Sequence, residues 1–161
     1  MDIRTGFGYD IHRLEKQEEG FFLLAQVKIK GNTHIVSHSD GDVLLHSLSN
    51  AILSALGKDD IGCYFPDNSE KTKDMNSLFI LDFALSEMER QGYRLSNVVA
   101  DIVLERPKLK PYRDDIKNNL AHFLHLDPSR IALHANTNEK VDAVGNEKAV
   151  IVYSQVLIIK E

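Results

Sequence analysis

The stretch that decides the fold spans residues 37–56 and reads SHSDGDVLLHSLSNAILSAL. Its second half carries apolar residues at helical spacing, which predicts a buried helix that ends near Gly57. Its first half holds four polar residues within five positions: His38, Ser39, Asp40 and Asp42. We expect Ser39 or Asp40 to cap the helix, because short polar side chains can accept the unpaired N–H groups of its first turn.

A polar stripe interrupts the apolar pattern of this helix. Asp42, His46 and Asn50 are four residues apart, so they share one helix face. A solvent-facing edge would explain the stripe, but Leu44 and Leu48 flank it, which argues against a fully solvated face. The other interpretation is that this face meets a second polar group inside the protein.

The N-terminal strand offers such a group at Asp10 and His12. Residues two apart in a strand point to the same side, so a carboxylate and an imidazole lie next to each other. A surface pair is the simpler interpretation of this motif alone. Together with His46, however, the pair forms a zinc-type ligand set that leaves one tetrahedral position open, which is typical of a catalytic site. Asp42 is then a candidate for holding an imidazole in position.

Three further segments carry possible site residues. The acidic segment GKDDIGCYFPD (57–67) contains Asp60 and Asp67 and is, from its composition, a solvated loop or part of a pocket. LHANTNEK (133–140) ends a strand with small polar residues and then Glu139, which could bind a hard cation such as Mg²⁺ or simply cap the next turn. ERPKLKPYR (105–113) is a basic turn that is either solvated or places a lysine near an anion. The remaining histidines are interpreted as structural or surface residues: His34, His122, His125 and His134.

Composition sets the broad class. The chain of 161 residues is 43% hydrophobic and 27% charged, which is typical of one soluble globular domain spanning 1–161. The net charge of −5 and the lack of a Lys/Arg cluster argue against nucleic-acid binding. Cys63 is the only cysteine, so no internal disulfide forms. No apolar run is long enough to span a membrane and no apolar signal core opens the chain, so we expect a cytoplasmic protein.

Strands and helices alternate along the chain. We expect strands over 3–14, 21–30, 93–105, 130–136 and 149–160, helices over about 40–57, 74–91 and 112–126, and a loop over 59–74. The pattern predicts an α+β fold, a mixed four-stranded sheet with helices packed on one face. The uncovered sheet face predicts self-association.

Four motifs carry a resemblance that covers essentially the whole chain. They are GFGYDIHRL (6–14), the long block from Ser37 to Asp67, ERPKLKP (105–111) and NTNEK (136–140). In this order the motifs are similar to those of the 2-C-methyl-D-erythritol 2,4-cyclodiphosphate synthase family of the non-mevalonate isoprenoid pathway. The resemblance implies a lyase that converts 4-diphosphocytidyl-2-C-methyl-D-erythritol 2-phosphate to the 2,4-cyclodiphosphate and CMP.

The resemblance also implies roles for individual residues. Zn²⁺ would be held by Asp10, His12 and His46, and a second metal, Mg²⁺ or Mn²⁺, by Glu139. His38 and Thr137 would be catalytic. The substrate would contact a larger set: Asp10, His12, His38, Ser39, Asp60, Gly62, Phe65, Asp67, Leu104, Lys108, Leu109, Asn136, Thr137 and Glu139. The family implies a homotrimer whose active sites lie between subunits, with the cytidine end and the zinc on different subunits.

The chain departs from the family pattern at three places. Asn50 stands where the family usually has Asp, and Asn136 replaces a usual Thr. The loop after Glu139–Lys140 normally resembles GFxGR, whereas residues 141–146 read VDAVGN. In the family this loop lines a central channel that can hold an isoprenoid diphosphate, so we expect that ligand site to be altered here. Two other functions remain open: a metal-dependent phosphohydrolase that activates water, and a non-catalytic trimer that only binds the cytidine nucleotide.

Overall fold

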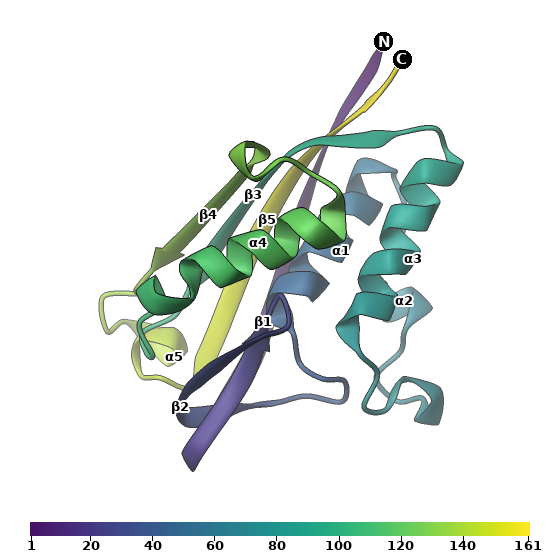
Figure 1. The fold of residues 1–161 in the computed structure, drawn as a ribbon. Helices are drawn as coiled ribbons and strands as arrows, with labels where there is room; N and C mark the ends of the chain where they lie inside the picture. The colour runs from purple at the N-terminus through teal and green to yellow at the C-terminus, as the bar shows by residue number, and fades with distance from the viewer.

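The computed structural model describes residues 1–161, apart from the side chain of residue 71 (Figure 1). The strands are β1 (Asp2–Leu24), β2 (Val27–Val36), β3 (Arg94–Val103), β4 (Ile131–Asn136) and β5 (Ala149–Lys160). The helices are α1 (Val43–Ala55), α2 (Ile61–Tyr64), α3 (Ser77–Arg90), α4 (Arg113–Leu124) and α5 (Asp142–Gly145), with short 3-10 turns at Glu70–Thr72, Lys110–Tyr112 and Pro128–Arg130. Among the described residues, no helix combines the length and hydrophobicity that crossing a bilayer requires. The cytoplasmic location stays a prediction.

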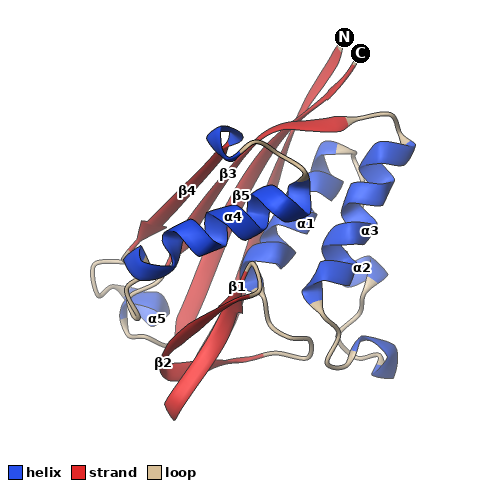
Figure 2. Ribbon diagram, in the orientation of Figure 1, coloured by secondary structure: helices blue, strands red, loops and turns tan.

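The sheet is mixed and its helices lie on one face (Figure 2). The strand order is β2-β1-β5-β3-β4, in which only β3 and β4 are parallel. Helices α1 and α4 pack against the sheet, and α3 packs on α1. The α+β class and the one-sided helix layer predicted from the sequence are therefore confirmed.

The predicted number of four strands is wrong, because the sheet has five. β1 does not turn into a loop after Leu14 but continues to Leu24, and β2 folds back along it. The reversal is a two-residue turn at Ala25 and Gln26, whose φ angles of 48° and 63° lie in the left-handed region that a type I′ hairpin turn requires at both positions. A tight hairpin gives β2 a place as an edge strand beside β1.

Two glycines bring α1 unusually close to β1. The position of a Cβ on Gly8 would lie 1.9 Å from the carbonyl oxygen of Ser47, and one on Gly6 would lie 1.9 Å from that of Ala51. Both neighbours are helix backbone, so any side chain at these positions would push the helix away. The glycines of the GFG motif thus set the distance between the strand and the helix that carries His46.

The two ends of α1 agree partly with the sequence prediction. The helix ends as expected, with Gly57 just beyond it at φ +67°. Its N-cap is Asp42, whose carboxylate accepts the Leu45 N–H, and the predicted caps Ser39 and Asp40 are wrong. Asp40 contacts α3 instead, because its carboxylate accepts the backbone N–H of Ser77.

The acidic segment 59–74 is more structured than the predicted loop. It contains α2 and the 3-10 turn Glu70–Thr72. The Asn50 side chain accepts the backbone N–H of Ile61 at 2.9 Å, which fixes the start of α2 against α1. The segment is therefore held at the polar side of α1, where it forms one wall of a cavity.

Candidate metal centre and substrate pocket

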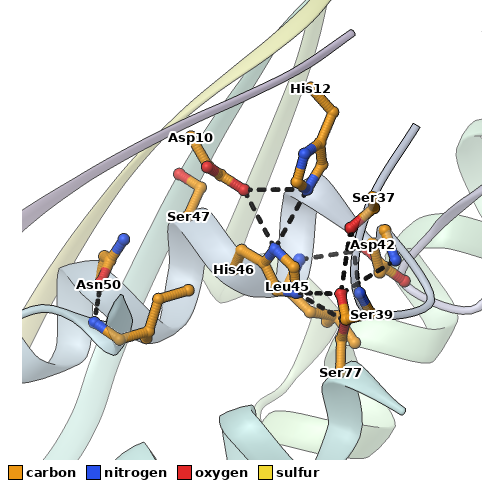
Figure 3. A network of polar contacts seen from close by, with 12 residues as sticks. Asp10, His12, Ser37, Ser39, Asp42, Leu45, His46, Ser47, Asn50 and Ser77 are labelled. Atoms are coloured by element: carbon orange, nitrogen blue, oxygen red, sulfur yellow. Dashed lines mark hydrogen bonds and ion pairs between the residues drawn. The ribbon is translucent and has the colours of Figure 1, made fainter. Parts of the chain in front are cut away.

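Three metal-ligand side chains meet between β1 and α1 (Figure 3). Asp10 and His12 come from one side of β1, and His46 comes from the first turns of α1. His46 Nδ1 lies 3.1 Å from Asp10 Oδ2 and 3.2 Å from His12 Nε2, and the Asp10 and His12 atoms are 3.3 Å apart. The side chains are 23%, 15% and 8% exposed for Asp10, His12 and His46. The sequence prediction that these residues converge is confirmed.

The spacing of these atoms fits a divalent metal ion. A tetrahedral ion with ligand distances of about 2.0–2.1 Å separates its ligand atoms by about 3.3 Å, which agrees with the observed triangle. The types of ligand atom agree as well. Two imidazole nitrogens and one carboxylate oxygen, which lie within 3.3 Å of one another, are ligands that Zn²⁺ commonly binds. A cation between these atoms satisfies all three at once.

The environment of His12 favours its metal-binding form. Burial lowers the pKa of the His12 imidazole, and the nearby His46 lowers it further, while Asp10 acts in the opposite direction. A ring with a lowered pKa stays neutral at physiological pH. A neutral ring has a lone pair on one of its two nitrogens, and that nitrogen can bind a metal ion.

Asp42 does not hold an imidazole in position, so that prediction is wrong. The carboxylate of Asp42 is fully buried and accepts the N–H groups of Ala25 at 3.0 Å, Gln26 at 2.7 Å and Leu45 at 3.2 Å. As the N-cap, Asp42 precedes the helix, and its side chain turns back to the hairpin turn instead of following the His46 face. Its role is to tie the β1–β2 turn to the start of α1.

Ser77 makes the shorter of two serine contacts with the other nitrogen of His46. Its Oγ lies 2.8 Å from His46 Nε2, and the Ser39 hydroxyl lies further away at 3.4 Å (Figure 3). Ser77 is fully buried at the first position of α3, and its hydroxyl also bonds to Asp40. Sequence reasoning missed Ser77, because a serine after an N-cap asparagine is ordinary helix-start sequence and lies 31 positions from His46.

A cavity of about 580 Å³ opens beside the three ligands. Besides the ligands, it is lined by five of the residues that the resemblance implied: His38, Ser39, Gly62, Phe65 and Asp67. The His38 ring is fixed by a contact of 3.0 Å between its Nε2 and the carbonyl of Ser69. Asp60 is not among the lining residues but directly precedes α2, as its N-cap residue. The cavity thus combines a metal-ligand set with polar side chains at one end.

The other predicted residues form a second group at the ends of β3 and β4. These strands are parallel, so the segments that follow them emerge at the same edge of the sheet, and the Leu104 N–H bonds to the carbonyl of Asn136. Lys108 and Leu109 line a separate cavity of about 300 Å³, together with the cationic Lys110 and Arg113. The two cavities have no lining residue in common. Within one chain, the structure does not bring this group to the metal centre.

Three residues of the second group have local contacts of their own. Thr137 Oγ1 and Glu139 Oε1 are 3.5 Å apart, and Glu139 is exposed in a left-handed conformation with φ 50°. The Asn136 amide donates to Asp101 Oδ1 at 2.6 Å. The carboxylate of Glu139 is therefore accessible to a cation, whereas the Asn136 side chain is engaged with its own sheet.

Comparison with known proteins decides the relationship. The model of the YgbB family matches residues 3–159. The chain belongs to the YgbB family. A 2-C-methyl-D-erythritol 2,4-cyclodiphosphate synthase of Prochlorococcus marinus is 42% identical, over 99% of this chain and 96% of the relative. The bifunctional enzyme IspD/IspF of a Wolbachia pipientis strain is 40% identical, and this chain spans 40% of its length.

A solved structure of the family has the same fold. IspF of Plasmodium falciparum, solved as a CDP complex, superposes with a TM-score of 0.86 at 36% identity, covering 99% of this chain and 97% of that one. The resemblance stated from the motifs is thereby confirmed at the level of the family. The match also extends over both groups of predicted site residues.

We expect metal binding in this family member to weaken on acidification. Protons compete with the metal for the imidazole of His12. Because the pKa of His12 is lowered, its ring stays neutral until the pH falls below the ordinary value of about 6.5. Zinc affinity, measured with a chromophoric chelator between pH 8 and pH 5, should be nearly constant at first and then fall steeply below that value. An affinity that is unchanged at pH 5 contradicts ligation by this ring.

Proposed function

We propose that this protein converts 4-diphosphocytidyl-2-C-methyl-D-erythritol 2-phosphate to 2-C-methyl-D-erythritol 2,4-cyclodiphosphate and CMP. The observation that carries the proposal is the triangle of Asp10, His12 and His46 ligand atoms at the end of a polar cavity, in a chain of the YgbB family. In this reaction an oxygen of the 2-phosphate forms a bond to the β-phosphorus. The bond from that phosphorus to the oxygen bridging it to the α-phosphate breaks, and CMP leaves with the electron pair.

The reaction needs positioning and charge neutralisation more than acid–base chemistry. Two phosphates repel each other, so their approach in line is the difficult step. Asp10, His12 and His46 would hold Zn²⁺, and Glu139 would hold Mg²⁺ or Mn²⁺. When bound, these ions supply positive charge to the phosphate oxygens. No protein nucleophile is required.

The cavity residues would orient the methylerythritol end of the substrate. His38 and Ser39 come directly before α1 and would hold the 2-phosphate, and Phe65 and Asp67 would line the opposite wall. Ser39 lines the same cavity as Asp10, His12 and His46, which supports a place for its hydroxyl beside the reacting phosphate. The place of His38 in the wall of this cavity supports the catalytic role that the resemblance implies.

The cytidine end would be bound by the second group of residues. Lys108 would approach a phosphate, Leu104 and Leu109 would contact the base, and Asp60 with Gly62 would receive the ribose. Thr137 would contact the α-phosphate with Asn136 beside it, and its catalytic role would be to stabilise the leaving group. The CDP complex of the Plasmodium relative supports a nucleotide ligand for this fold.

The complete site would require a homotrimer. The zinc ligands line one cavity, and Lys108 and Leu109 of the second group line another, so a neighbouring copy would bring them together. The uncovered sheet face supports this assembly, because Phe7, Tyr9 and Tyr153 form an exposed aromatic cluster there. Exposed apolar clusters of this kind are usually buried by association.

The altered loop would change the central channel of such a trimer. Residues 141–146 include the short helix α5, in which Val144 is buried and Asn146 bonds back to the carbonyl of Asp142. These side chains offer neither the aromatic ring nor the guanidinium of the usual family loop. We therefore expect an isoprenoid diphosphate to bind weakly or not at all in its usual position.

A single assay separates the proposed function from its alternatives. The purified protein is incubated with substrate and Zn²⁺ and Mg²⁺, CMP is quantified, and the phosphorus-containing product is identified by ³¹P NMR. Equimolar CMP and cyclic diphosphate are expected. Inorganic phosphate without cyclic product would indicate a phosphohydrolase, and CMP binding without turnover would indicate a non-catalytic binding protein.

Glu139→Gln should separate the two metal sites. The substitution keeps the shape of the side chain but removes the negative charge that attracts the second metal. We expect turnover to fall about 100-fold, because a charge-stabilising contact in the transition state is lost. Zinc content should remain that of the unmodified protein. Glu147→Gln is a matched control, because Glu147 belongs to neither predicted ligand set and its carboxylate forms only a loose 3.8 Å pair with Arg106.

A further inference from the structure

The second nitrogen of His46 is the start of a polar chain that leads away from the metal centre. His46 Nε2 lies 2.8 Å from Ser77 Oγ, and Ser77 Oγ bonds to Asp40 Oδ1. Asp40 comes from the segment before α1 and Ser77 from the start of α3, so the chain joins two elements that lie 37 positions apart in the sequence. Neither Asp40 nor Ser77 is among the residues to which the family resemblance assigns a role.

The direction of the hydrogen bonds follows from the donors and acceptors available. An ionised carboxylate can only accept, so the hydroxyl of Ser77 donates its proton to Asp40. The same oxygen then remains as an acceptor for a proton on His46 Nε2. The Ser77 oxygen therefore favours the tautomer with the proton on Nε2, which leaves a lone pair on Nδ1, the atom that faces Asp10 and His12. In the metal-free protein the Asp10 carboxylate, 3.1 Å from Nδ1, favours the opposite tautomer.

Asp40 is itself held in place. Its Oδ2 accepts the backbone N–H of Ser77 and the side-chain amide of Gln26, both at 3.0 Å. Its Oδ1 accepts the backbone N–H of Asp42 at 3.2 Å in addition to the Ser77 hydroxyl. With so many donors around it, the carboxylate has little freedom to rotate, and it fixes the hydroxyl of Ser77 in turn.

We propose that Asp40 and Ser77 form a positioning relay that holds His46 as the Nε2–H tautomer, with Nδ1 directed at the divalent metal. This inference rests on the proposed function, because it assumes that Asp10, His12 and His46 bind a metal. Ser77 and Asp40 touch neither the metal position nor the substrate. They act through the ring of His46, in the way that carboxylate and hydroxyl partners of metal-bound histidines raise ligand basicity and fix ring orientation.

The relay also connects the metal centre to the wall of the cavity. Ser77 begins α3, and Ile80 of the same helix lines the cavity together with Met75 just before it. The backbone bond from Ser77 to Asp40 is independent of the hydroxyl, so it persists when the side chain is shortened. A substitution of the hydroxyl alone can therefore test the relay without releasing the helix.

The test compares Ser77→Ala with Ser49→Ala. Both serines are fully buried, but the Ser49 hydroxyl donates to the carbonyl of Leu45 within α1 and has no contact with the ligands. Zinc affinity of the metal-free proteins is measured by competition with a chromophoric chelator. We expect Ser77→Ala to bind Zn²⁺ about 10- to 100-fold more weakly than the unmodified protein, the range known for partners of metal-bound histidines. Ser49→Ala should stay within about twofold of it.

A spectroscopic measurement on the unmodified protein provides a second test that does not depend on the variants folding. In metal-free protein labelled with ¹⁵N-histidine, ¹H–¹⁵N correlation spectra report which nitrogen of His46 carries the proton. The relay requires that the Nε2–H tautomer is populated in the unmodified protein, and that its fraction is lower in Ser77→Ala, where the Asp10 carboxylate still favours a proton on Nδ1. A proton found only on Nδ1 in the unmodified protein, or equal zinc affinity in Ser77→Ala and Ser49→Ala, overturns the relay.

These outcomes are distinct from failure of the proposed function. If the unmodified protein binds zinc tightly but releases no CMP, the enzymatic proposal fails while the affinity comparison still decides the relay. If it forms the cyclic product and Ser77→Ala binds zinc normally, only the relay fails. If the unmodified protein binds no zinc at all, both the metal assignment and the relay are wrong.

Discussion

His46→Ala should abolish zinc binding and lower turnover by about 10³-fold or more. The substitution removes one of the three ligand atoms, and the two that remain on β1 hold an ion far less firmly. A metal ion at the reacting phosphates contributes several kcal/mol, which corresponds to a loss of this size. Zinc content by atomic emission and CMP release measured on the same preparation provide the readout.

The fold and assembly should survive this substitution. His46 lies at the cavity against Asp10 and His12, whereas the closest contacts of α1 with β1 are backbone contacts at Gly6 and Gly8, so its loss leaves that packing in place. Size-exclusion chromatography should show the same oligomer as the unmodified protein. His122→Ala, on the exposed side of α4, is the matched control and should keep both zinc and activity. Full activity of a zinc-free His46→Ala protein would falsify the metal assignment.

Gly8→Ala should strongly destabilise the protein and displace the metal site at the same time. The added methyl group would lie 1.9 Å from the Ser47 carbonyl oxygen and 2.6 Å from the Ala51 nitrogen, both of which belong to the backbone of α1. Because the contacted atoms are backbone, no change of side-chain conformation relieves the contact, and the whole helix must shift. We expect a loss of about 3 kcal/mol or more in the free energy of unfolding, at the upper end for overpacked sites.

The readout is urea unfolding at one fixed protein concentration, because the stability of an oligomer depends on concentration. Zinc affinity should fall in parallel, since the shifted helix carries His46. Gly31→Ala is the control, because a Cβ at Gly31 meets only the Pro107 side chain, at 3.5 Å, and should change stability by less than about 1 kcal/mol. Equal stability and zinc affinity in the two variants would show that close helix–strand contact does not position the ligand.

Much of the fold could be predicted from the sequence, because the spacing of apolar residues and the residue types that favour turns are local signals. The end of α1 just before Gly57 and the approximate extent of α3 and α4 followed from apolar spacing and glycine placement. The hairpin was misjudged because Ala25 and Gln26 are unusual residues for a turn with positive φ. Their conformation is supported by the buried carboxylate of Asp42, a contact from a distant part of the sequence.

The metal ligands could be predicted from their residue types, whereas the residues that support them could not. Asp10, His12 and His46 are residue types with few structural reasons to lie in such positions, so chemistry alone singled them out. Ser77 carries no such signal, and its role depends on α3 packing against α1. The prediction for Asp42 was wrong because it relied on spacing alone. Asp42 lies four residues before His46, but it is the N-cap of the helix and its side chain bonds to the hairpin turn.

The pairing of β1 with β5 has a consequence for how this unit can be combined with others. Asp2 lies opposite Lys160, so the start of β1 and the end of β5, and with them the two termini, lie next to each other (Figure 1). Asp10 and His12 are further along β1, roughly 30 Å away at the usual rise of a strand. A neighbouring module could therefore be fused at either terminus without obstructing the catalytic entrance, an arrangement suited to modular enzymes such as the bifunctional relative.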